Sequence, residues 1–321
     1  MRHFPMTTLA GALCLVLGIP GSGVAQREPQ AVYINLVDSA SGSLEEITGA
    51  LRAGFGGAGW EVLASYQTGM AANSCDYGAR IMVVHSPRYA RSVLAHGTRT
   101  AFAVPIRLVV YQDEAGTHVA AVNPLSINRT IVAEEGFEGE SGALLQELGG
   151  IVTQAVSGTP VHRPYGQVRR RGLIGRTMGV MAGGPFTGKI KTVYTLDDDT
   201  PQALERVADQ VWQALRDLGG RGRWQVRGAY RLDLADQGVV VLGVSGAAME
   251  ARAFRIVGAG NEDSRRAYRC PGLAHAAAFP IEVVVMRDSG RVRVTLVDAM
   301  YRMKMYFEDA GQWAFAKNMG M

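Results

Sequence analysis

An internal repeat constrains the fold of this sequence more than any other feature. The segment Pro280–Asp288 resembles Pro105–Asp113, and the match continues without a gap as far as Val297, which corresponds to Val122. Both pairs of positions have the same offset (280 − 105 = 175; 297 − 122 = 175). Self-similarity at a constant offset indicates a duplicated structural unit. The sequence therefore predicts two tandem copies of one domain.

The residue patterns of the two copies predict the same order of helices and strands. In the first copy, Ser43 and Glu46 form a capping box that begins an amphipathic helix, and alternating apolar residues predict strands around it. The strand at Trp60–Tyr66 has a counterpart in the second copy at Trp224–Tyr230. Hairpin-linked strands with amphipathic helices are typical of α+β folds. We expect two tandem domains, each an antiparallel sheet with helices on one face, packed together like a covalently joined dimer.

Composition divides the chain into four segments. Residues 1–25 carry one basic residue and then an apolar run, which is typical of a secretory signal peptide cleaved near Ala25. The first domain is expected at residues 28–157 and the second at 189–321. Between them, residues 158–188 are rich in Gly, Arg and Pro and have no clean period, which predicts a connector between the domains.

The predicted mature chain keeps two cysteines, Cys75 and Cys270. In an oxidising compartment, two cysteines favour one disulfide. Because the two do not occupy matching positions in the repeat, such a bridge would join the two halves; two separate free thiols are the alternative. No later segment is long and apolar enough to span a membrane. We therefore expect a periplasmic or secreted protein without a transmembrane span.

The composition is that of a folded protein, with 47% hydrophobic and 19% charged residues. The formal net charge is only +4, and basic residues are scattered except at Arg169–Arg171. Since aromatic residues do not alternate with them, the pattern argues against nucleic acid as a partner. The glycines of residues 158–188 lack the strand-turn-helix context of a nucleotide-binding motif. The sequence also has no haem-attachment motif of the Cys-x-x-Cys-His type.

Three motifs of the first copy carry a family resemblance: Gly-Trp-Glu-Val-Leu (Gly59–Leu63), Val-Val-His-Ser-Pro (Val83–Pro87) and Ala-Val-Asn-Pro (Ala121–Pro124). With the Pro-Ile-Arg-Leu-Val-Val-Tyr strand, they resemble the bacterial domain-of-unknown-function family 302. The resemblance implies small α+β domains related to half of the TATA-binding protein, in an exported protein, and no established chemistry. The second copy has Ser245-Gly246 and Asp298-Ala299 in place of Ser-Pro and Asn-Pro, which argues against two equivalent sites.

Methionines are the most distinctive candidate metal ligands. Met300, Met303 and Met305 follow the second hairpin, and on a strand the last two would face the same side. Soft thioethers select Cu(I), which an exported protein can meet; methionines that fill gaps in the core are the alternative. The apolar positions also change from even to odd numbers here, which predicts a β-bulge or break between Asp298 and Tyr301.

Histidines give two weaker candidates. His275 follows Cys270 closely, so the two are a candidate soft-metal pair, with a loop histidine as the alternative. His85 and Ser86 have the side chains of a base and a nucleophile. However, adjacent residues on a strand point to opposite faces, so this pair is not expected to form a hydrogen-bonded catalytic dyad.

These observations predict an exported, non-catalytic binding protein for a small molecule, a metal or a partner protein of the cell envelope. The alternative is a copper or haem handling protein that uses the methionines near the C-terminus. A third hypothesis is an enzyme with a site between the two copies, although no sequence motif supports it.

Overall fold

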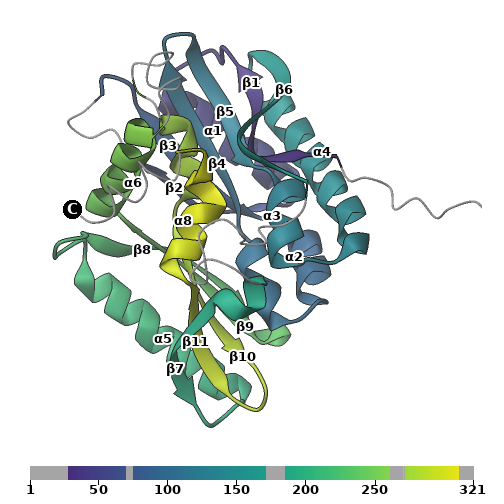
Figure 1. Cartoon of the computed structure of the whole chain (residues 1–321), viewed down its shortest axis with the longest axis vertical. Helices are drawn as coiled ribbons and strands as arrows, with labels where there is room; N and C mark the ends of the chain where they lie inside the picture. The colour runs from purple at the N-terminus through teal and green to yellow at the C-terminus, as the bar shows by residue number, and fades with distance from the viewer. Residues whose placement is uncertain (1–27, 70–74, 171–184, 261–269, 271, 311–321) are drawn as a thin grey trace, which may run out of the picture.

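The computed structural model describes residues 28–69, 75–170, 185–260, 270 and 272–310. They form two antiparallel sheets and accompanying helices, so the fold is α+β as predicted. Figure 1 shows the two halves side by side, the first coloured purple to teal and the second green to yellow. The predicted signal peptide lies outside the described residues. Within those residues, no helix has both the length and the apolar character needed to cross a bilayer.

The first sheet has the strand order β2-β3-β4-β5-β1-β6. Its strands form because β-branched and apolar residues alternate or run together between turn residues. The bounds are β1 (Gln30–Asp38), β2 (Glu61–Gln67), β3 (Ala79–His85), β4 (Ile106–Asp113), β5 (Gly116–Val122) and β6 (Thr159–Arg169).

The second sheet has the strand order β7-β11-β10-β9-β8. If β7 to β11 are matched in chain order with β1 to β5, the second sheet, read from β8 to β7, has the strand order β2-β3-β4-β5-β1 of the first sheet. The agreement supports the tandem duplication, which stays a prediction. The bounds are β7 (Ile190–Leu196), β8 (Val226–Leu234), β9 (Val239–Gly246), β10 (Ile281–Arg287) and β11 (Val292–Val297).

The prediction that residues 158–188 form a connector is wrong for their first part. Thr159–Arg169 is the strand β6, which pairs antiparallel with β1 along its whole length. The strand escaped prediction because Pro164 and Gly166 interrupt it and its side chains are mostly exposed. Both residues are tolerated because β6 lies at the edge of the sheet, where one side of its backbone needs no partner strand.

Local signals explain where the helices begin. Ser43 and Glu46 form the predicted capping box, in which Ser43 Oγ accepts from the Glu46 amide at 3.2 Å. Thr200 Oγ1 accepts from the Ala203 amide at 3.2 Å. The α-helices are α1 (Leu44–Gly57), α2 (Pro87–Leu94), α3 (Pro124–Ile131), α4 (Glu138–Ala155), α5 (Pro201–Leu218), α6 (Ala247–Gly260) and α8 (Ala299–Phe307). The 3-10 helices are η1 (Thr98–Ala103), η2 (Glu135–Phe137), η4 (Phe186–Lys189), η5 (Ala235–Gln237), η6 (Leu273–Ala278) and η7 (Glu308–Ala310).

The segment after the second hairpin is a helix that begins at Ala299, so the predicted break of the strand is confirmed, whereas a bulge with a strand beyond it is wrong. Asp298 caps α8 by accepting from the Tyr301 amide at 3.1 Å. Met303 and Met305 therefore do not share a face, because residues two apart on a helix point in different directions. The change from even to odd apolar positions marked the end of a strand and the start of a helix.

The two halves pack through equivalent elements. The 3-10 helix η1 of the first half contacts β9 and β10 of the second, and η6 contacts β3, β4 and β5 of the first. These helices are equivalent in the repeat, because Thr98 and Leu273 are also related by the offset of 175 (273 − 98 = 175). The largest apolar cluster includes residues of both halves. The halves thus share one core at their interface.

A buried carboxylate adds a polar contact between the halves. Glu250 on α6 accepts hydrogen bonds from the Thr68 hydroxyl at 2.6 Å and the Gly69 amide at 2.7 Å, just beyond β2. Ser245 donates to its other oxygen. A buried charge is stable only when hydrogen bonds replace its lost water, so this carboxylate fixes α6 against the first sheet.

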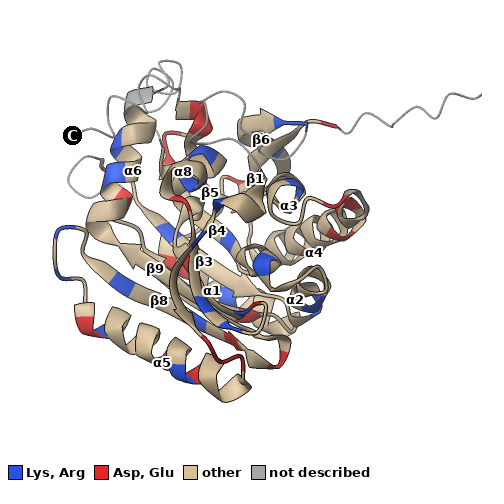
Figure 2. Ribbon diagram, turned by 60° about the horizontal axis from the view of Figure 1, so that its bottom comes forward, with Lys and Arg blue, Asp and Glu red and all other residues tan. Residues whose placement is uncertain are grey.

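The outer face of the second sheet has a separate core. The apolar stripe of α5, which includes Leu204 and Val207, packs against Val240, Leu242 and Val285. Arginines and acidic residues alternate along the exposed side of this helix (Figure 2). The sheet therefore has α5 on one face and the first half on the other.

Candidate functional site

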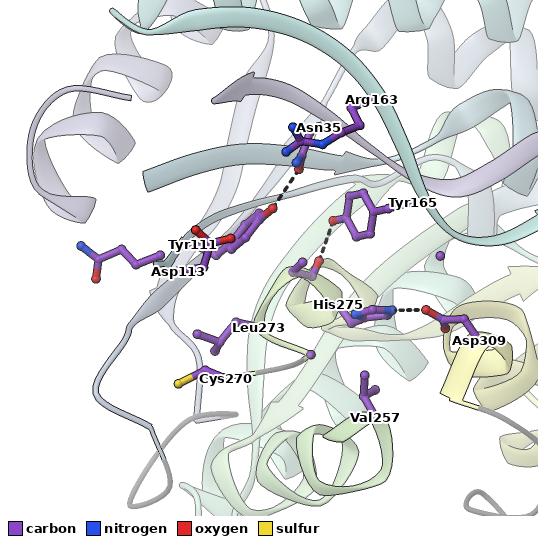
Figure 3. Close-up of a pocket in the computed structure, with 14 residues that line it drawn as sticks. Asn35, Tyr111, Asp113, Arg163, Tyr165, Val257, Cys270, Leu273, His275 and Asp309 are labelled. Carbon is purple, nitrogen blue, oxygen red and sulfur yellow. Dashed lines mark hydrogen bonds and ion pairs between the residues drawn. The ribbon is translucent and has the colours of Figure 1, made fainter. Parts of the chain in front are cut away.

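A pocket of about 260 Å³ lies between the two halves. The first half contributes residues from β1, β4 and β6, and the second contributes residues from α6, η6 and η7. Figure 3 shows Asn35 and Arg163 at one end and His275 with Asp309 at the other. Tyr165 lies between these ends (Figure 3). No single half of the chain forms this pocket.

His275 and Asp309 form an ion pair or hydrogen bond at one end of the pocket, with 2.7 Å between Nε2 and Oδ2. His275 is 8% exposed and lies edge-on to Tyr33. Burial raises the pKa of the Asp309 carboxyl, but the neighbouring His275 outweighs it, so the pKa lies below its usual value. Among the described residues, His275 Nδ1 and Asp309 Oδ1 are buried without a hydrogen-bond partner.

Two tyrosines form walls of the pocket and use their hydroxyls within the protein. Tyr165 donates to the Ala274 carbonyl at 2.7 Å, and Tyr111 donates to Asn35 Oδ1 at 3.1 Å. Burial raises the pKa of both phenols well above its ordinary value. They are therefore neutral at physiological pH and present aromatic faces rather than nucleophilic oxygens.

Charges at the far end of the pocket are paired with one another. Asp38 lies 2.7 Å from His118 Nδ1, and Asp113 lies 2.8 Å from His118 Nε2. Arg163 binds Asp38 through both terminal nitrogens, at 2.5 and 2.8 Å. The bidentate geometry is the strong form of this contact. The charged side chains at this end of the pocket therefore bind one another.

Cys75 and Cys270 form a disulfide, which confirms that alternative over two free thiols. Their Cα atoms are 5.7 Å apart, within the ordinary range for a bridge. As expected from their unmatched positions, the bond joins the two halves. Cys270 also lines the pocket. Because its sulfur is bonded, Cys270 is not available as the thiolate partner of His275 in a metal site.

The three methionines do not converge on one point. Met305 is 1% exposed in the core shared by the halves. Met300 and Met303 pack against a small cluster that contains Ile256. These apolar surroundings favour the packing interpretation. In the part of the chain that the structure describes, no three His, Cys, Asp or Glu side chains are arranged to hold a metal ion.

The pair His85 and Ser86 is not arranged for catalysis. The Ser86 hydroxyl caps α2, where it accepts from the Tyr89 amide at 3.4 Å. His85 is 3% exposed, and burial lowers its pKa. A hydroxyl that accepts from a helix N-terminus is positioned by the helix rather than by a base.

Acid should destabilise the protein partly through His85. Its folded-state pKa is lowered, so below about pH 6.5 the unfolded chain binds the proton more readily. The stability that the neutral ring contributes above that pH is lost as the pH falls toward the folded-state pKa. We expect His85→Gln to reduce the loss of unfolding free energy between pH 7.5 and 5.0, measured by urea titration. The exposed His162 provides the control, since His162→Gln should leave the pH dependence unchanged.

The sequence missed the partner of His275. Nothing in the sequence context of Asp309 connects it with residue 275. Tyr165 was missed because it lies in the supposed connector. Each residue comes from a different segment, so no spacing motif relates them.

Comparisons with known proteins find a family match in the first half of the chain. Residues 37–155 match the family model described as "Domain of unknown function DUF302". This match agrees with the resemblance that the motifs of the first copy predicted. A solved structure of an uncharacterized conserved DUF302 protein from Bacillus stearothermophilus is similar, with 16% identity over 39% of this chain and 98% of that chain and a TM-score of 0.34. No curated protein matches the chain.

Proposed function

We propose that this protein is an exported, non-catalytic binding protein whose small-molecule ligand occupies the pocket between the two halves. The observation that carries the proposal is the pocket itself, which both halves build and which has, at one end, buried polar atoms without a partner among the residues that the structure describes. Ligand sites occur preferentially at domain interfaces, with apolar walls and a few polar groups that orient the ligand. A volume of about 260 Å³ suits a compact molecule.

The disulfide supports export. Disulfides persist in oxidising compartments and are rare in the cytosol. The bond between Cys75 and Cys270 agrees with the signal-peptide pattern of residues 1–25. Both features point to the periplasm or the exterior of the cell, where small-molecule binding proteins encounter their ligands.

The pocket favours binding over covalent chemistry. Cys270 is oxidised, and the hydroxyls of Tyr111 and Tyr165 are neutral donors. One observation favours the enzyme hypothesis as a second candidate: Asp309 orients His275 as a carboxylate orients a general base. That geometry supports proton transfer to or from a bound molecule, and it supplies no nucleophile. The copper or haem alternative has less support because the methionines lie in apolar packing.

The proposal predicts that blocking the pocket removes the ligand. Ala274 lines the pocket and is half-buried, so Ala274→Phe places a ring in the space. Native mass spectrometry of protein purified from the envelope fraction should show a bound small molecule in the wild type and none in this variant. The control is Ala53→Phe, an exposed change on α1 that should keep the ligand. Equal retention by both variants would place the ligand elsewhere and contradict the proposal.

A further inference from the structure

We infer that the pocket selects a small organic cation, an ammonium or amidinium group on a compact apolar body, and that His275 and Asp309 recognise it. This inference rests on the proposed function and defines the ligand class. The two residues form one end of the pocket, and within the described part of the chain His275 Nδ1 and Asp309 Oδ1 are buried without a hydrogen-bond partner. Buried polar atoms are nearly always hydrogen-bonded, so such atoms need an explanation in a folded protein.

Asp309 Oδ1 is a carboxylate oxygen and therefore a hydrogen-bond acceptor. The other oxygen, Oδ2, accepts from the proton on His275 Nε2, which holds the two side chains together. A buried carboxylate oxygen without a partner among the described residues requires a donor from the ligand.

The charges around Asp309 leave room for a cation. Arg169 is the cation that acts on it from β6, but Arg169 binds Glu308 at 2.8 Å and donates to the carbonyls of Lys304 and Met305. Lys304 lies 3.5 Å from Glu308. The basic groups on this side thus have partners of their own, and the only described side chain that is hydrogen-bonded to Asp309 is that of His275.

Three side-chain donors of the pocket are already engaged. The hydroxyls of Tyr111 and Tyr165 and the guanidinium of Arg163 all bind protein acceptors. An anionic ligand would therefore have to compete for these donors, whereas a cation would meet the buried carboxylate oxygen of Asp309. Aromatic faces add to this preference, because cations are attracted to the faces of tyrosine rings. Leu273 and Val257 supply an apolar surface for the body of the ligand.

Four probes with the same ring test the inference: benzylamine, benzamidine, benzyl alcohol and benzoate. In isothermal titration with the disulfide-intact mature protein, the two cations should bind at least about tenfold more tightly than benzyl alcohol, as expected for one hydrogen bond to a charged group. Benzoate should be the weakest. Asp309→Asn should remove the preference for cations while leaving the affinity for benzyl alcohol within about threefold.

The matched control is Asp197→Asn, which removes one negative charge from a side chain that is 81% exposed and does not line the pocket. It should change the affinity for benzylamine by less than about threefold, since solvent and salt screen an exposed charge outside the pocket. Tighter binding of benzoate, or equal effects of the two substitutions, overturns the inference and leaves the proposed function standing. If no probe binds and the purified protein carries no small molecule, the proposed function itself fails.

Discussion

Replacing Glu282 with alanine is expected to lower the free energy of unfolding by about 3–5 kcal/mol, the cost of leaving a buried charge without its partner. Glu282 Oε1 lies 2.8 Å from Arg107 Nη1 across the interface of the two halves. The side chains are only 4% and 2% exposed. Arg302 lies 3.5 Å from the other carboxylate oxygen. The substitution therefore acts on two buried cations at once.

The remaining contacts of these arginines do not replace the carboxylate. Arg107 and Arg302 lie over the ring of Tyr306, with 4.6 and 4.9 Å between the guanidinium carbons and the ring centroid. Both also donate to the carbonyls of Ala278 and Pro280. These contacts provide hydrogen bonds but no negative charge. Without Glu282, two like charges would face each other in a medium of low dielectric constant.

Urea titration of the disulfide-intact protein measures the effect. Glu205→Ala on the exposed side of α5 is the control for loss of a glutamate and should change stability by less than about 0.5 kcal/mol. The double variant Arg107→Met, Glu282→Leu should be more stable than Glu282→Ala, because it removes one of the two uncompensated cations and leaves only Arg302 without the carboxylate. A loss below 1 kcal/mol in Glu282→Ala would show that water or rearrangement compensates the arginines.

The sequence repeat relates residues that meet at the interface between the two halves. Arg107 and Glu282 are equivalent positions (282 − 107 = 175), and the equivalent elements η1 and η6 each pack on the other half. Two equivalent positions meet when two copies pack about an approximate two-fold axis. In a true dimer, such a position faces its own copy. In this chain the two positions have opposite charges.

Local signals were sufficient for much of the fold. The capping box of α1, the cap at Thr200 and the Pro-Ile hairpins depend on residues close in sequence, and the structure contains each of them. Short helices and strands were harder to predict from the sequence. The strand β6 resembles a loop because its edge position tolerates Pro164 and polar side chains. The helix α8 resembles a strand because alternating apolar residues over a few positions do not distinguish the two.

The residues of the candidate site lie far apart in the sequence, so no local sequence pattern predicts that they meet. His275, Asp309 and Tyr165 lie on three separate elements and meet only when the halves pack. The methionines attracted attention because of their composition, whereas their surroundings are apolar. Cysteine counting succeeded for the disulfide because two cysteines allow only one intramolecular bridge.

The disulfide should have the second large effect. Removing it with the double variant Cys75→Ser, Cys270→Ser is expected to lower the free energy of unfolding by up to about 5 kcal/mol, the chain-entropy value for a bridge between residues 195 apart. The bond acts mainly by limiting the conformations of the unfolded chain. Wild-type protein in reducing buffer should match the double variant. A single substitution is unsuitable, because it leaves one thiol free to form bridges between molecules.

The urea dependence of stability separates this effect from that of Glu282. A bridge that closes most of the chain keeps the unfolded state compact, so its removal exposes more surface on unfolding and should increase the m-value. Glu282→Ala changes the folded state and should leave the m-value unaltered. The loss of the bridge should also weaken benzylamine binding, because Cys270 forms part of the pocket wall. If the double variant shows an unchanged m-value and a loss below 1 kcal/mol, the packed interface alone holds the halves together, and the bridge has little part in shaping the pocket.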